Sequence, residues 1–197
     1  MIVYIHGFNS GFNPDSHKAK GLETIDKVIG LNYNSFDTHE NILLDLTRKL
    51  DKIEDVTLIV GTSLGGYFAL VLAKHFDLPS VVINPAVAPY EYLANLVGST
   101  FENHAYDSTN TLSHKVARSY KDKEIENELS EYHYTPMLLV DYGDELFDST
   151  RTLERLNAFS AIAYKGGDHR FAHIKEALPF IESYVNTCSF VTNINHD

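Results

Sequence analysis

The amino-acid sequence predicts an α/β fold in which helices cover both faces of a six-stranded, mostly parallel sheet. Short apolar runs alternate along the chain with longer amphipathic segments, which is the pattern of strands joined by helices. The runs mostly lack polar alternation, as expected for strands that are buried on both faces. A chain of 197 residues suits one domain at roughly 150 residues per domain, so we expect a single domain over residues 1–197.

The expected strands are rich in Val, Ile, Leu and Tyr and occupy residues 2–5, 28–33, 56–60, 80–83, 136–142 and 159–164. The run at 28–33 is the weakest because Gly30 interrupts it. Helices are expected at 41–53, 67–76 and 173–184. In the first of these, Ile42, Leu46 and Leu50 share one face, as in a helix that covers a sheet.

One connection is far longer than the others. Residues 86–134 separate the fourth and fifth expected strands, and connections in α/β units are usually shorter than about 12 residues. We expect a lid insertion over the carboxyl edge of the sheet, with helices at 90–97 and 121–132, because such insertions usually shape a ligand pocket. A purely structural extension is the alternative. A short C-terminal tail is expected at 186–197.

Charge and composition exclude several classes of partner. The chain has 16 basic and 27 acidic residues and a net charge of −11, which disfavours nucleic acid and anionic membranes. A single cysteine, Cys188, excludes an internal disulfide framework. No apolar run approaches the roughly 18 residues of a membrane span, and the N-terminus does not resemble a signal peptide. We therefore expect a cytoplasmic protein, and the sequence predicts no particular oligomeric state.

A Gly-x-Ser-x-Gly motif at residues 61–65 carries the strongest chemical signal. It follows an expected strand and precedes an expected helix, which is the position of a nucleophile elbow. Gly61 and Gly65 fit this reading because strand and helix approach too closely there for side chains. The sequence therefore predicts Ser63 as a nucleophile. An ordinary glycine-rich turn is the alternative.

A serine nucleophile needs a base, and histidine is the usual one. His169 follows the last expected strand in a glycine-bearing loop, which is the position expected for the general base, and His173 is its main competitor. The two are spaced i, i+4 like a metal-ligand pair. However, no Glu follows His169 as in the zinc-protease motif, and the lone cysteine is remote in sequence, so no metal site is expected.

The base in turn needs a carboxylate that fixes its tautomer. Asp144 lies nearest the end of the fifth expected strand and is the favoured acid. Asp148 is the alternative acid, although it could instead cap the following helix. Glu145 and Asp141 are weaker candidates.

Acyl transfer also needs backbone N–H groups that bind the oxyanion. Leu64, which follows the nucleophile, would supply one, and Phe8 in the loop after the first strand would supply the other, with Asn9 as a less favoured choice. This loop could instead be a structural turn. His6 is expected to pack or hydrogen-bond beneath the loop.

At these positions the sequence resembles the α/β-hydrolases, and specifically the small bacterial YqiA/YcfP-like esterase family. The segments that carry the resemblance are YIHGFNS (4–10), GTSLGGY (61–67), VINPAV (82–87), GDELFD (143–148) and GDHRF (167–171). The resemblance implies a minimal hydrolase sheet in the order 2-1-3-4-5-6, with Ser63 at the topological switch point. It also implies hydrolysis of short acyl esters and of acyl-CoA thioesters.

These observations predict a serine carboxylesterase or thioesterase that acts on a small-molecule acyl ester or thioester through Ser63, His169 and Asp144, without a cofactor. The competing hypothesis is a binding or regulatory module that uses the hydrolase pocket without turnover. Four basic residues of the insertion could bind the phosphates of CoA or form a solvated helix face. They are Lys115, Arg118, Lys121 and Lys123.

Overall fold

A six-stranded parallel sheet forms the centre of the protein. The computed structural model describes residues 1–129 and 132–194. The strands lie in the order β2-β1-β3-β4-β7-β8, and each neighbouring pair is parallel. Their bounds are β1 (Ile2–Ile5), β2 (Val28–Leu31), β3 (Leu58–Thr62), β4 (Ser80–Ile83), β7 (Met137–Asp141) and β8 (Ser160–Tyr164). The predicted fold class and strand order are confirmed.

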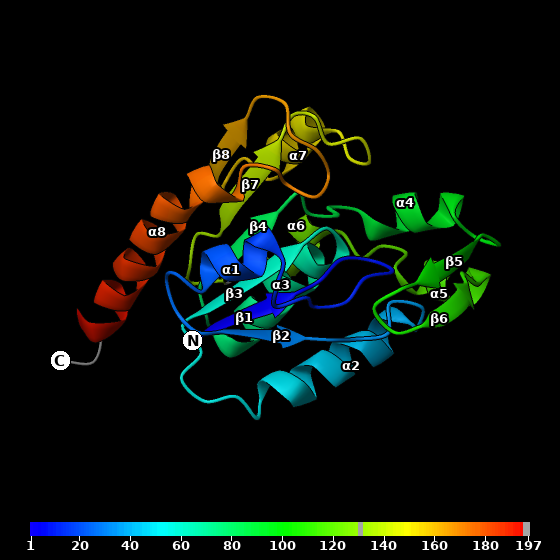
Figure 1. The fold of residues 1–197 in the computed structure, drawn as a ribbon, viewed down its shortest axis with the longest axis horizontal. Helices are drawn as coiled ribbons and strands as arrows, with labels where there is room; N and C mark the ends of the chain where they lie inside the picture. Colours follow the sequence, from blue (N-terminus) through cyan, green and yellow to red (C-terminus); the bar gives the residue numbers. More distant parts are fainter. Residues whose placement is uncertain (130–131, 195–197) are drawn as a thin grey trace.

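Helices pack on both faces of this sheet (Figure 1). One face packs against α1 (His17–Leu22) and α8 (Ile174–Ile194), and the other against α2 (His39–Leu50) and α3 (Leu64–Phe76). Successive strand residues point to opposite faces, so Ile2 joins the apolar cluster beneath α1 and α8, whereas Val3 joins the cluster beneath α2 and α3. Both side chains are fully buried.

The long insertion lies between β4 and β7. It contains α4 (Pro89–Asn95), a hairpin of β5 (Thr100–Asn103) and β6 (Ser108–Thr111), α5 (His114–Ser119) and α6 (Ile125–Glu128). Figure 1 shows α4, α5 and the hairpin gathered at the end of the sheet toward which β1 points. The helix expected at 90–97 is present as α4. The helix expected at 121–132 is wrong in extent, because only α6 forms there, and residues 130–131 lie outside the described part.

The C-terminal helix is longer than its sequence pattern predicted. α8 continues to Ile194, through most of the segment expected as a tail from residue 186, and residues 195–197 lie outside the described part. Ile181 and Cys188 are buried, and Val185 packs against the same apolar cluster. The apolar stripe of the helix therefore continues past residue 184 at i, i+4 and i+7 spacing. The remaining helix of the described residues is α7 (Ser149–Arg155), which follows β7.

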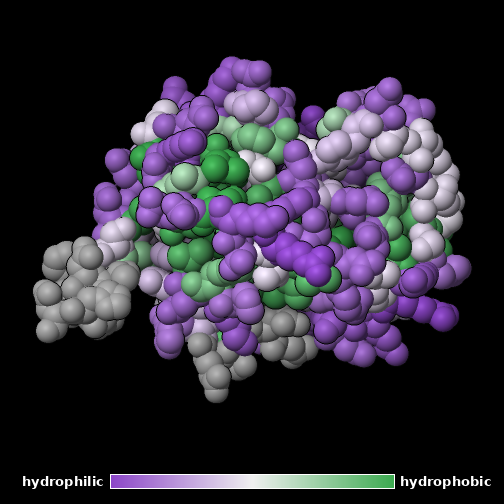
Figure 2. All heavy atoms as spheres, turned by 90° about the horizontal axis from the view of Figure 1, so that it is seen from below, coloured by the Kyte–Doolittle hydropathy of each residue, from purple (hydrophilic) through white to green (hydrophobic). Residues whose placement is uncertain are grey.

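The visible surface is largely polar. The face seen from below Figure 1 carries mainly hydrophilic side chains with smaller hydrophobic areas between them (Figure 2). Among the described residues, no helix combines the length and the apolar character needed to cross a bilayer.

Candidate active site

Ser63 occupies a strained turn between β3 and α3. Its φ of 57° and ψ of −126° lie in a region that non-glycine residues rarely adopt. The turn is held from several directions, because Ser63 N–H donates to the carbonyl of Ile83 and the Ser63 carbonyl accepts from Gly66 and Ala86. The side chain is therefore fixed at the carboxyl edge of the central strands.

The glycines around Ser63 allow the close approach of strand and helix. A Cβ on Gly61 would lie 2.1 Å from the Gly65 carbonyl oxygen, and a Cβ on Gly65 would lie 2.2 Å from the Ile5 carbonyl oxygen. Backbone atoms cannot move aside as flexible side chains do. Glycine is therefore a steric requirement at both positions of the motif.

Gly65→Ala is expected to destabilise the protein by at least about 2 kcal/mol, because its methyl group would overlap backbone carbonyls of β1. Urea unfolding measures this loss. Gly21→Ala is the matched control, since the nearest atoms to a Cβ there belong to side chains, Leu178 at 3.3 Å and Ile174 at 3.6 Å. Alanine also favours the helix by about 1 kcal/mol. Equal stability of the two variants would contradict this account of the elbow.

His169 and Asp144 form a hydrogen-bonded pair at the ends of β8 and β7. His169 Nδ1 lies 3.0 Å from Oδ1 and 2.9 Å from Oδ2 of Asp144. The Asp144 side chain is 1% exposed, and its Oδ1 also accepts from the backbone N–H groups of Leu146 and Phe147. A carboxylate accepts a hydrogen bond from Nδ1–H, so this arrangement keeps the proton on Nδ1 and leaves Nε2 of neutral His169 as an acceptor.

Asp148 and Glu145 have different contacts. Asp148 caps α7, where its carboxylate accepts from the N–H groups of Thr150 and Arg151. Glu145 accepts from the backbone N–H of His169 at 2.9 Å. The structure thus brings Asp144, and not Asp148, into contact with the ring of His169.

A second His–Asp pair anchors the loop that carries His169. Asp141 is fully buried, and its Oδ1 lies 2.6 Å from His173 Nδ1. Its Oδ2 accepts from the backbone N–H groups of Ala172 and Asp168, and a Cβ on Gly167 would lie 1.9 Å from Oδ2. These two weaker candidates for base and acid therefore contact each other and fix the shape of loop 167–173.

Asn84 strengthens the same loop and was not singled out from the sequence. Its Oδ1 accepts from the N–H of Asp141, and its Nδ2 donates to the carbonyls of Asp168 and His169. The available sequence signal was an asparagine directly after the fourth expected strand, within the family-like segment 82–87. Its φ is 41°, and asparagine is one of the few residues that tolerate this conformation.

The loop after β1 lies directly against the nucleophile. A Cβ on Gly7 would come within 3.1 Å of Ser63 Cβ. Asn9 N–H donates to Ser35 Oγ, so it is already engaged. Within residues 1–129 and 132–194, the N–H groups of Phe8 and Leu64 have no protein acceptor. These are the two donors that the sequence predicted for the oxyanion.

His6 supports this loop from beneath. Its Nδ1 donates to the Gly7 carbonyl, and its Nε2 accepts from Tyr33 N–H. The Tyr33 ring stacks on the imidazole at 4.5 Å, and the Tyr33 hydroxyl donates to the His6 carbonyl. Burial lowers the pKa of His6 from 6.5 to about 4, so the ring is neutral at pH 7.

We expect acid to destabilise the fold through His6. Between pH 6.5 and pH 4 the unfolded chain binds a proton at His6 that the folded chain excludes, so the free energy of unfolding falls as the pH falls, by up to about 3 kcal/mol. Urea unfolding of wild type and His6→Asn at pH 7 and pH 4.5 separates this contribution from that of the carboxylates. The same pH dependence in both proteins would contradict the assignment.

The candidate catalytic groups meet in one cavity of about 490 Å³. Ser63, His169 and Phe8 line it, and Asp144 contacts His169 from behind. Among the described residues, no hydrogen bond joins Ser63 Oγ to His169 in this structure; such contacts often tighten only when substrate is bound. Two cations, Lys18 and Arg170, also line the cavity, and neither was singled out from the sequence.

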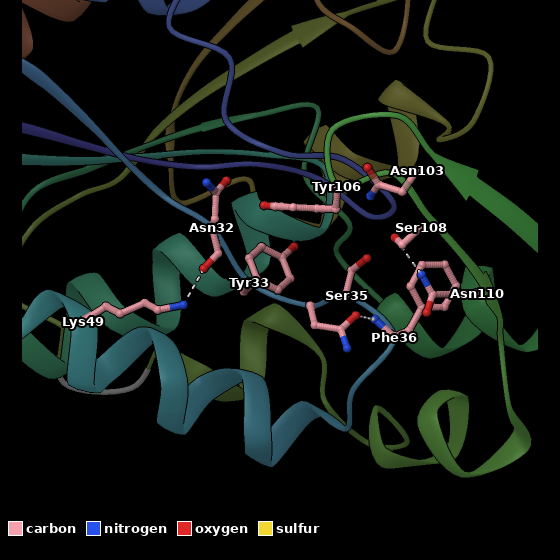
Figure 3. A pocket seen from close by; sticks show the side chains of 10 residues that line it. Asn32, Tyr33, Ser35, Phe36, Lys49, Asn103, Tyr106, Ser108 and Asn110 are labelled. Carbon is pink, nitrogen blue, oxygen red and sulfur yellow. Dashed lines mark hydrogen bonds between the residues drawn. The ribbon is translucent and has the colours of Figure 1, made fainter.

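Two other cavities in the described part of the chain are lined by none of these groups. One of about 430 Å³ lies between α2 and the β5–β6 hairpin. Figure 3 shows Lys49 of α2 reaching the Asn32 carbonyl and Asn103 of the hairpin on the cavity's opposite side. Of the basic residues of the insertion, Lys121 and Lys123 line a separate cavity of about 230 Å³. Within the described part of the chain, no cluster of His, Cys, Asp and Glu could hold a metal ion.

Comparison with known sequences gives a family without an assigned function. A family model described as an uncharacterised protein family, UPF0227, matches residues 1–186. The UPF0227 protein YcfP of Salmonella arizonae is 28% identical over 190 residues, which cover 93% of this chain and 98% of that protein. The YcfP protein of Escherichia coli O9:H4 is 27% identical with the same coverage.

Solved structures show the same architecture. Mouse alpha/beta hydrolase domain-containing protein 10 superposes with a TM-score of 0.73 at 18% identity, covering 94% of this chain and 89% of that one. A monoacylglycerol lipase from Paleococcus ferrophilus gives 0.73 at 15% identity, with 95% and 94% coverage. Est1E from Butyrivibrio proteoclasticus gives 0.68 at 16% identity, with 100% and 88% coverage. At these identities the likeness establishes the α/β-hydrolase fold.

Proposed function

The chain belongs to the uncharacterised protein family UPF0227, and we propose that it is a serine hydrolase that cleaves short acyl esters or acyl thioesters through an acyl-enzyme intermediate. One observation carries the proposal. The strained Ser63 and the carboxylate-bound His169 line the same cavity, although they come from opposite halves of the chain. A binding module would gain nothing from a strained serine beside an oriented imidazole.

The first half of the reaction acylates Ser63. His169 Nε2 takes the hydroxyl proton while Ser63 Oγ attacks the acyl carbonyl, and the Phe8 and Leu64 N–H groups bind the oxyanion. Asp144 keeps the proton on Nδ1 and stabilises the imidazolium that forms. Collapse of the tetrahedral intermediate breaks the bond to the alkoxide or thiolate, which leaves with the proton from Nε2.

The second half regenerates the enzyme. Neutral His169 takes a proton from water, and the resulting hydroxide attacks the acyl carbonyl. The oxyanion returns to the same two N–H groups, and collapse releases the carboxylic acid and Ser63 Oγ, which recovers its proton from Nε2. No step needs a cofactor.

We also propose that the protein acts in the cytoplasm on small molecules. The net charge of −11 supports small molecules as partners, because it disfavours nucleic acid and anionic lipid.

Covalent labelling tests the proposal. A fluorophosphonate probe reacts with an activated serine, so we expect it to label wild type at Ser63, as located by peptide mass spectrometry, and to leave Ser63→Ala unlabelled. Ser183→Ala is the control, because that serine lies exposed on α8. Absence of labelling in wild type, or equal labelling of Ser63→Ala, would overturn the proposal. Rates with phenyl butyrate and its thioester analogue then rank oxygen against sulfur leaving groups.

A further inference from the structure

The cavity that holds Ser63 has a charge opposite to that of the whole protein. The chain carries −11, but Lys18 and Arg170 line this cavity, and no Asp or Glu is among its lining residues in the part of the chain that the structure describes. A cavity lined by one sign of charge concentrates ligands of the opposite sign. The local charge therefore favours an anionic ligand that the rest of the surface repels.

Lys18 is held at the cavity wall by a small, well-anchored helix. Ser16 caps α1 through its side chain, and Ala19 and Leu22 are buried beneath it. The Lys18 ammonium donates to the Arg170 carbonyl at 2.7 Å. An ammonium has three N–H donors, so this bond leaves others for a ligand.

In the part of the chain that the structure describes, neither cation is directly paired with a carboxylate. Over residues 1–129 and 132–194, Lys18 and Arg170 form no salt bridge. Asp168 and Asp141 act on Lys18 through space, and Asp141 is already bound to His173. Burial lowers the pKa of Lys18 to about 8, so the ammonium is charged at pH 7 but poorly solvated. An ion in this state gains from an anionic partner.

We propose that Lys18 and Arg170 bind a carboxylate or phosphate group of the substrate while its acyl carbonyl lies at Ser63. This inference rests on the proposed function and adds the substrate class: esters or thioesters with an anionic group. Phe8, Tyr92 and Leu146 supply apolar surface in the same cavity, which suits the hydrocarbon part of such a molecule. The anion is either on the acyl side or on the leaving group.

Three substrates test the proposal. Phenyl butyrate is neutral, the phenyl monoester of adipic acid carries its carboxylate on the acyl side, and 3-carboxyphenyl butyrate carries it on the leaving group. For each protein, kcat/KM with an anionic ester is divided by kcat/KM with phenyl butyrate. Lys18→Gln removes the positive charge of Lys18, and Arg170→Gln removes the second cation of the cavity. Lys20→Gln is the matched control on the same helix, since Lys20 is exposed and bound to Asp15.

We expect Lys18→Gln to lower this ratio of kcat/KM values by about tenfold or more for one of the anionic esters. A loss of this size is typical when a hydrogen bond to a charged group is removed. The ester that is affected identifies the side of the anion. Arg170→Gln should lower the same ratio, and Lys20→Gln should leave it unchanged. A ratio that stays within twofold of wild type for both anionic esters in Lys18→Gln would overturn the inference while the proposed hydrolase function stands.

A binding measurement separates the two proposals. Calorimetric titration with adipate and with phenyl phosphate requires no catalysis. If wild type hydrolyses none of the esters and Ser63 is not labelled, the hydrolase proposal fails. The anion site would still be supported if adipate or phenyl phosphate bound to wild type and to Lys20→Gln but not to Lys18→Gln. Equal affinity of all three proteins for these anions would overturn it.

Discussion

Ser63→Ala is expected to abolish ester hydrolysis, with kcat for phenyl butyrate falling by about 10⁴-fold to 10⁶-fold. The substitution removes the proposed nucleophilic oxygen but leaves the Phe8 and Leu64 N–H groups and the Asp144–His169 pair in place. Alanine tolerates the backbone of residue 63 as poorly as serine does, so the strain is unchanged. We therefore expect the free energy of unfolding to change by less than about 1 kcal/mol.

Steady-state rates and urea unfolding of the same preparation measure the two quantities together. Wild type and Ser183→Ala provide the reference values. A Ser63→Ala protein that is folded and retains activity within tenfold of wild type would show that the cavity does not use this serine. A loss of activity accompanied by unfolding would instead assign Ser63 a structural role.

The sheet was predictable because its strands are buried on both faces and therefore stand out in the sequence as short, continuous apolar runs. Ile2, Val60 and Ile83 are fully buried, and their runs contain few polar residues, as expected for strands that helices cover on both faces. Once the strands are in order, parallel topology brings their carboxyl ends to one edge. This is why Ser63 and His169, which are distant in sequence, could be predicted to lie together.

The insertion and the cations could not be predicted in the same way. The hairpin of Thr100–Asn103 and Ser108–Thr111 consists of polar residues apart from Phe101, and only Asn103 is buried. No apolar alternation therefore marks these strands in the sequence. Lys18 and the Arg170 carbonyl are 152 residues apart, and no local sequence pattern distinguishes Lys18 from the exposed lysines of the chain. Its role as a cavity residue depends on how α1 packs against the sheet, which is a tertiary property.

Asp144→Asn is expected to reduce turnover by up to about 10⁴-fold while the fold is retained. An asparagine oxygen can still accept from the N–H groups of Leu146 and Phe147, so the loop keeps its hydrogen bonds. The amide nitrogen would then face His169 and donate to Nδ1. This reverses the tautomer and places the proton on Nε2, where the ring cannot accept the serine proton.

The matched variant is Asp148→Asn, four residues further along the same segment. Asparagine is as good an N-cap as aspartate, so we expect this variant to keep both activity and stability, whereas Asp148→Ala should lose about 1 kcal/mol of stability with the cap and little turnover. Asp144→Asn and Asp148→Asn thus each remove one carboxylate charge without changing the length of the side chain. If Asp144→Asn turned over phenyl butyrate normally and Asp148→Asn were inactive, the acid would be Asp148, and the contact between Asp144 and His169 would serve only to hold the loop.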